Sequence, residues 1–224
     1  MTDSFPPNER LSPLQRRLIT EFFAREARFT LTGGAALAGY YFGHRETHDL
    51  DLFAEPGPDL EEAARVLQEA AVACGASLSP VRKSPTFSRF IAQRGDERCL
   101  VDLAIDSTER VDPEPRRFGA VRVDTLREIA ANKLDALLGR SEIRDLVDLK
   151  AILEAGVDLG QAMRDAERKD AGADPATLAW VLDQITISQS ARLPGGVASV
   201  ELDAFRKEIV RRLRAIALER AQGR

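Results

Sequence analysis

The chain has 224 residues and a mass of 24.7 kDa, with 44% hydrophobic and 30% charged residues. These fractions are typical of globular proteins and exclude wholesale disorder, a collagen-like repeat and a coiled coil. The net charge of −4 excludes a protein that binds polyanions over its whole surface, because such proteins are strongly basic. Any contact with nucleic acid must therefore be local.

No segment has the properties of a membrane span or a secretory signal. The longest nearly apolar stretch, 33–43, is much shorter than the ~20 residues that cross a bilayer. The first ten residues lack the basic-then-apolar order of a signal peptide. We therefore expect a cytoplasmic protein that makes no membrane contact.

The first half of the chain alternates between helical and strand patterns. Residues 107–118 contain two prolines and many charges, so they are predicted to form a surface loop. The predicted helices span 14–27, 35–42 and 60–74, and the predicted strands span 29–32, 48–54, 78–82, 87–93, 99–105 and 120–123.

The second half of the chain has helical patterns throughout. These predicted helices span 125–138, 142–155, 159–168, 175–185 and 201–220. We expect an α/β fold with two domains, in which a mixed sheet with flanking helices (1–124) precedes an all-helical part (125–224). The two parts are expected to share a core, because about 100 residues are marginal for independent stability.

Two carboxylates stand two residues apart in the predicted strand 48–54. Period-two alternation places Asp49 and Asp51 on one face of that strand and Leu50 and Leu52 on the other. Two like charges side by side repel each other, and a cation between them removes that repulsion. A hard divalent ion with oxygen ligands, such as Mg²⁺, fits this pair. The alternative is a solvent-facing pair on an edge strand.

A third carboxylate, Asp102, lies at the centre of the otherwise apolar strand 99–105. It needs a partner, because burying an unpaired charge is costly. That partner is either a metal ion shared with Asp49 and Asp51, or a nearby arginine. Three carboxylates on strands around Mg²⁺ would suit two-metal phosphoryl or nucleotidyl transfer.

Two further features suggest that the chain binds phosphate. Gly33 and Gly34 close a predicted strand and open a predicted helix, where glycine allows close backbone approach and the helix N-terminus offers N–H donors. A plain tight turn is the alternative. Lys133 lies on the apolar face of the helix 125–138 and needs an anion such as a nucleotide phosphate, unless its stem carries the ammonium to solvent.

Four motifs in this order resemble the AbiEii/AbiGii-type nucleotidyltransferase family, which supplies toxins of bacterial toxin–antitoxin systems on a polymerase-beta-like nucleotidyltransferase core. The resemblance spans about residues 29–153. One departure is Ala35, where the family usually has Thr or Ser. The motifs read Gly33-Gly34-Ala35-Ala36-Leu37, Arg45-Glu-Thr47-His-Asp49-Leu-Asp51-Leu52, Lys133-Leu-Asp-Ala136-Leu137 and Arg144-Asp145-Leu-Val-Asp148-Leu149.

The resemblance implies a role for each matched residue. Asp49 and Asp51 are implied as metal ligands, and the strand argument above adds Asp102 to them. Asp145 is implied as a further catalytic acid, and the alternative is that Asp145 and Asp148 simply cap or pair within the helices. The residues implied around the nucleotide are Gly33, Gly34, Arg45, Thr47 and Lys133, with the glycines on one side of the nucleotide and the lysine on the other.

The resemblance also implies an activity, which is Mg²⁺-dependent transfer of NMP from an NTP to an RNA acceptor with release of pyrophosphate. The expected acceptor is the 3′ end of tRNA, and a cognate antitoxin is an expected partner. Two other classes stay open, namely a small-molecule nucleotidyltransferase of the antibiotic-modifying type and a non-catalytic nucleotide-binding module. Basic residues at 82–98 and on the C-terminal helix, where Lys207, Arg211 and Arg214 share a face, could contact RNA phosphates or simply be solvated.

Overall fold

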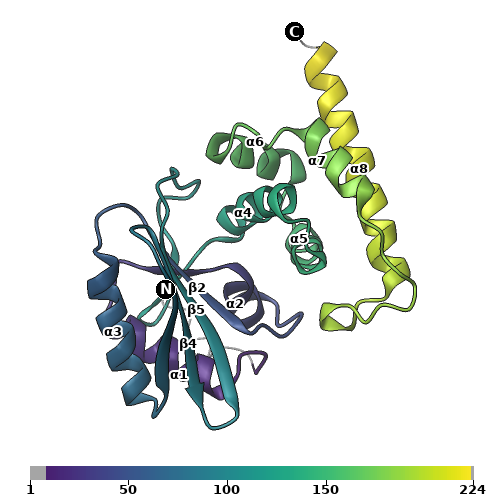
Figure 1. Ribbon diagram of the computed structural model, residues 1–224. Helices are drawn as coiled ribbons and strands as arrows, with labels where there is room; N and C mark the ends of the chain where they lie inside the picture. The colour runs from purple at the N-terminus through teal and green to yellow at the C-terminus, as the bar shows by residue number, and fades with distance from the viewer. Residues whose placement is uncertain (1–8, 223–224) are drawn as a thin grey trace. The chain divides into compact units, whose positions relative to one another are not determined.

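In the computed structural model, which describes residues 9–222, the chain divides into two units (Figure 1). Unit 1 holds the chain up to Thr108 together with Pro113–Thr125. Unit 2 holds Glu109–Asp112 and the chain from Leu126 onward. Unit 1 is a sheet with helices and unit 2 is all helical, so the expected fold class is confirmed.

Unit 1 is built on a seven-stranded mixed sheet with the order β3-β4-β5-β2-β1-β7-β6. The pairs β2–β5 and β1–β7 are parallel, and the other neighbours are antiparallel. The carboxylate-bearing strands β2 and β5 are therefore direct neighbours near the middle of the sheet. The strands are β1 (Thr30–Thr32), β2 (Asp49–Ala54), β3 (Ser77–Lys83), β4 (Phe87–Arg94), β5 (Glu97–Ile105), β6 (Arg116–Phe118) and β7 (Val121–Val123).

Two helices, α1 (Pro13–Phe23) and α3 (Leu60–Ala73), pack against each other and against β5, as Figure 1 shows. Both begin at a side-chain cap, which satisfies N–H groups that lack partners within the helix: Ser12 forms a capping box with Gln15, and Asp59 caps α3. Their apolar faces supply much of the buried core of unit 1. The opposite face of the sheet is thereby left to the polar residues of β2 and β5.

Between β1 and β2 the chain turns through α2 (Gly33–Ala36), which continues as the π-helix η1 (Leu37–Tyr41). A helix is predicted here, but its change to π-helical bonding is not visible in the sequence. Single π-turns inside helices are frequent at functional sites. This turn follows directly on the glycine pair.

Two expectations about unit 1 were wrong. The first helix ends at Phe23 rather than at residue 27, and beyond it the Glu26 carboxylate accepts hydrogen bonds from the backbone and guanidinium of Arg28. The predicted loop 107–118 contains β6, which is stabilised by pairing with β7 rather than by any apolar pattern of its own.

Unit 2 contains the five helices predicted for it, with ends within two residues of those expected. Asp158 and Asp174 cap α6 and α7, and they explain where these helices start. No helix in residues 9–222 is long and apolar enough to cross a membrane. The helices are α4 (Leu126–Gly139), α5 (Ile143–Glu154), α6 (Leu159–Lys169), α7 (Pro175–Gln184) and α8 (Ser199–Gln222), with a 3₁₀ turn, η2, at Pro194–Gly196.

Candidate active site

The two carboxylates of β2 lie on one face of the sheet, as the alternation predicts. Along β2, Asp49 and Asp51 are half-buried, whereas Leu50 and Leu52 are fully buried on the side that α1 and α3 cover. The hydroxyl of Thr47 donates a hydrogen bond to Oδ1 of Asp49 at 2.6 Å. The carboxylates therefore face away from the core and remain within reach of solvent.

Asp102 is the register partner of Asp51 on the adjacent parallel strand β5, so the two side chains project from the same face. Arg89 on β4 binds Asp102 through two hydrogen bonds, Nε to Oδ1 at 2.7 Å and Nη2 to Oδ2 at 2.6 Å. These hydrogen bonds raise the pKa of Arg89 above its ordinary value, and the charges of Asp51 and Asp49 add to the effect. The arginine pairing that the sequence left open for Asp102 is thus present.

The glycine pair belongs to the same site, because it makes room for the residues of the second motif. A Cβ atom on Gly33 would lie 2.2 Å from Oδ2 of Asp51. A Cβ atom on Gly34 would lie 2.6 Å from Nη2 of Arg45 and 3.2 Å from Oγ1 of Thr47. Arg45 and Thr47 are both buried, with 5% of their surface exposed. The first two motifs are therefore joined by direct contact, and a side chain at either glycine would displace site residues.

Replacing Gly33 by alanine is expected to cost more stability than the same change at Gly75, and to abolish the nucleotidyl transfer that the resemblance implies. Both residues have a positive φ, +64° and +69°, which costs a residue with a Cβ about 1–2 kcal/mol. Only Gly33 adds a collision, because nothing lies within 4 Å of a Cβ on Gly75. Urea unfolding and a transfer assay of both variants measure the difference, and equal effects at the two positions would contradict the close approach of Asp51.

One residue of this site, Thr32, was not predicted from the sequence. Thr32 is the register partner of Asp51 on β1 and is 4% exposed, and within residues 9–222 its Oγ1 has no hydrogen-bond partner. A buried hydroxyl without a partner is uncommon. Its position directly before the glycine pair, at a buried site in a short strand, is the only clue that the sequence offers.

The donor set of this face suits a hard divalent cation. Asp49 and Asp51 supply carboxylate oxygens from one face of one strand, which is the chemistry that Mg²⁺ prefers. Asp102 stands beside them, but both of its oxygens accept hydrogen bonds from Arg89. In the described part of the chain, no three His, Cys, Asp or Glu side chains are already gathered as a metal cluster. The fit of this face to a divalent cation therefore depends on the Asp49–Asp51 pair, and Asp102 is the neighbour of that pair.

In unit 2, the third and fourth motifs meet in a buried ion network. Nζ of Lys133 on α4 lies 2.7 Å from Asp145 and 2.7 Å from Asp148, both fully buried on α5. Arg140 donates two further hydrogen bonds to Asp145. Burial by itself would raise the pKa of Asp145, but the hydrogen bonds from Arg140 and the charge of Lys133 outweigh it and hold that pKa below its ordinary value.

The structure therefore gives Lys133 two anionic partners inside unit 2. Its predicted contact with a nucleotide phosphate stays a prediction, as does the catalytic role of Asp145. The role of Arg140 was not predicted from the sequence, because its hydrogen bonds to Asp145 depend on how α4 turns into α5.

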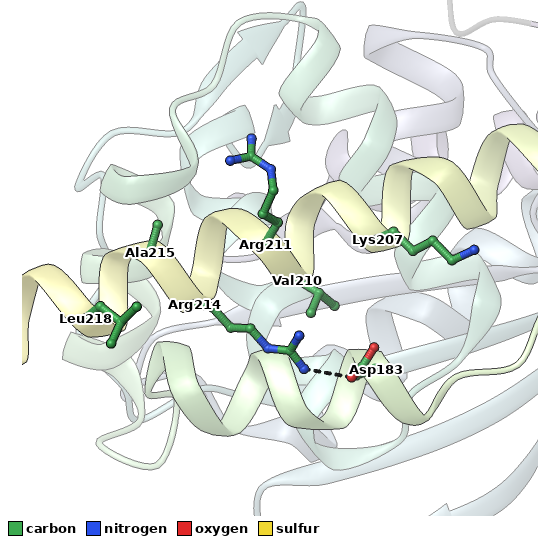
Figure 2. Close-up of a pocket in the computed structure, with 7 residues that line it drawn as sticks. All are labelled: Asp183, Lys207, Val210, Arg211, Arg214, Ala215 and Leu218. Carbon is green, nitrogen blue, oxygen red and sulfur yellow. Dashed lines mark hydrogen bonds and ion pairs between the residues drawn. The ribbon is translucent and has the colours of Figure 1, made fainter.

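The basic face of α8 is neutralised within unit 2. It borders a groove of about 470 Å³ whose apolar lining includes Val210 and Leu218. In Figure 2, Arg214 reaches toward α7 and Arg211 points away from it. On this helix, each of the three cations considered for RNA has a carboxylate partner: Lys207 pairs with Asp203, Arg211 with Glu208 and Arg214 with Asp183.

Comparisons with known proteins bear on the fold and on the family of this chain. A sequence comparison with curated proteins finds no match. JHP933 from Helicobacter pylori has a similar structure, with a TM-score of 0.55 and 18% identity over 93% of this chain and 95% of that one. A structure described as "putative nucleotidyltransferase from H. pylori" gives a TM-score of 0.56 and 18% identity over 91% and 94% of the two chains. At this identity the two structures show a shared fold.

The comparison with family models is the decisive one, because it covers nearly the whole chain. Residues 17–223 match the family described as "Nucleotidyl transferase AbiEii toxin, Type IV TA system". The match includes all four motifs and both units. The chain therefore belongs to the AbiEii family of nucleotidyltransferase toxins.

Proposed function

We propose that this protein transfers NMP from an NTP to a hydroxyl of an RNA acceptor, the 3′ end of tRNA, and releases pyrophosphate. It would act in the cytoplasm as the toxin of a toxin–antitoxin pair, restrained by a cognate antitoxin. The observation that carries the proposal is the contact of the glycine turn with the carboxylate face, where Gly33 lies against Asp51. A turn that admits phosphate beside a pair of metal-binding carboxylates is what nucleotidyl transfer requires.

Each residue of the face has a task in this proposal. Asp49 and Asp51 would hold Mg²⁺, which supplies charge neutralisation at the phosphates and at the attacking oxygen when it is bound. Thr47 fixes the orientation of Asp49 through its hydrogen bond. Gly33 and Gly34 would let backbone N–H groups approach the triphosphate.

Asp102 and Arg89 would serve the acceptor side of the site. Arg89 holds both oxygens of Asp102 and so fixes the plane of that carboxylate beside Asp51. From this position Asp102 would complete the metal site or accept the proton of the attacking hydroxyl. Ala35 offers no hydroxyl at the position where the family usually has one, so nucleotide selection would depend on the backbone and on Arg45 and Thr47.

The test is a transfer assay with purified protein, Mg²⁺, total tRNA and each α-³²P NTP in turn, resolved on a denaturing gel. A labelled tRNA band that is absent with Asp49→Ala is the expected result, and the NTP that gives it identifies the nucleotide. If no NTP labels tRNA, the RNA acceptor is wrong. Small-molecule acceptors are then tested by pyrophosphate release.

A further inference from the structure

A half-buried aromatic ring lies on the same face of the sheet as the carboxylates. Phe87 is on β4, two residues before Arg89, and their register partners on β5 are Ala104 and Asp102. Because side chains alternate along a strand, Phe87 and Arg89 project from the face that carries Asp102 and Asp51. The residues between and after them, Ser88 and Phe90, are buried on the other face.

Two guanidinium groups lie over this ring. The Cζ atom of Arg89 lies 5.6 Å from the ring centroid of Phe87, and that of Arg82 lies 5.7 Å from it. Arg82 is the register partner of Arg89 on the edge strand β3, so it shares the same face. Arg82 is exposed, and within residues 9–222 it has no carboxylate partner. On α8, by contrast, Lys207, Arg211 and Arg214 each have a carboxylate partner.

The order of the strands separates this ring from the glycine turn. From β1 outward, the row reads Thr32 beside the glycines, then Asp51, then Asp102, then Arg89, then Arg82. The carboxylates therefore lie between the glycine turn and the ring. With strands about 4.8 Å apart, β4 is roughly 10 Å from β2, about the reach of one or two nucleotides. A nucleotide held at the glycines leaves the far side of the carboxylates for the acceptor.

We propose that Phe87, Arg82 and Arg89 form an acceptor platform on which an unpaired base at the 3′ end of the RNA stacks while Arg82 binds the backbone phosphate. This platform rests on the proposed function, in which RNA is the acceptor, and it names the residues that bind the RNA. An aromatic ring with guanidinium groups over it suits single-stranded RNA, because bases stack on aromatic and guanidinium planes and each phosphate carries a negative charge. Because β3 is the edge strand of the sheet, the RNA strand can continue past it.

The experiment measures KM for tRNA, KM for the NTP and kcat for four variants. Phe87→Leu keeps apolar bulk but removes the ring, and it is expected to raise KM for tRNA about tenfold while KM for the NTP changes less than about twofold. Phe87→Tyr keeps the ring and should match the wild type. Arg82→Ala should reduce the slope of log affinity against log salt by about 0.7, the share of one single-strand phosphate contact.

Lys83→Ala is the matched control. Lys83 is the next residue along β3, but it lies on the other face, where it lines a groove with residues of α3. The Lys83→Ala variant should leave KM for tRNA, KM for the NTP and the salt slope unchanged. If Phe87→Leu binds tRNA as the wild type does, or if Lys83→Ala weakens binding as much as Arg82→Ala, the platform is wrong while the proposed function stands. If the wild-type protein labels no RNA, the proposed function fails and the platform fails with it.

Discussion

Replacing Asp51 by asparagine is expected to lower kcat for nucleotidyl transfer by about 10³-fold without lowering the stability of the protein. Metal-bound charge stabilisation is worth several kcal/mol, and about 4 kcal/mol corresponds to this factor in rate. Asp49 and Asp51 share one face of β2, so removing one charge relieves their mutual repulsion. The transfer assay described under the proposed function measures the rate, and urea unfolding measures the stability.

Asp96→Asn is the control for this change. Asp96 is exposed in the turn between β4 and β5, at a distance from the carboxylate face along both strands, so its loss should leave rate and stability unchanged. A structural role for Asp51 would appear as unfolding of Asp51→Asn at a lower urea concentration than the wild type. A variant that keeps more than about a tenth of the wild-type rate would contradict the metal role.

Asp145→Asn is expected to reduce the free energy of unfolding by about 3–5 kcal/mol. Asp145 is fully buried and is held by Lys133 and Arg140, so its neutralisation leaves two cations with one fewer partner. Because the pKa of Asp145 lies below its ordinary value of 3.8, its contribution is complete above about pH 4. The contribution is then lost as the pH falls through the depressed pKa. The difference in the free energy of unfolding between wild type and variant should therefore disappear over that range.

Glu154→Gln on the same helix provides the comparison. Glu154 pairs with Lys150 one turn away, and its side chain is 62% exposed. Exposed pairs of this kind contribute at most about 0.5 kcal/mol. Urea unfolding of both variants at pH 7 should therefore separate them clearly. Similar losses would show that Asp145 contributes no more to stability than a surface charge.

The sequence predicted the elements whose stability comes from local pattern. The Leu/Asp alternation of β2 predicted both the strand and the direction of its carboxylates, and the helices of unit 2 followed from apolar periodicity. The strand β6 was missed because its three residues, Arg116–Phe118, carry no strand pattern and are ordered by pairing with β7.

The site was predictable as a set of residues but not as a set of contacts. Asp102 was found from its apolar strand, yet its bond to Arg89 depends on the register of β4 against β5. In the same way, Lys133 was expected to need an anion, but the packing of α4 against α5 decides that Asp145 and Asp148 supply it. Such pairings are non-local and cannot be read from spacing.

The position of β1 inside the sheet has a consequence for how the toxin is made. β1 lies between β2 and β7, and it is joined to β7 through Leu31, whose carbonyl accepts the N–H of Asp124 at 3.0 Å. During synthesis β1 and β2 emerge early, whereas β7 comes only at the end of unit 1. Until then β1 presents an open strand edge, which is a site for unwanted pairing. The ribosome must therefore release nearly all of unit 1 before the seven-stranded sheet of the nascent chain can close.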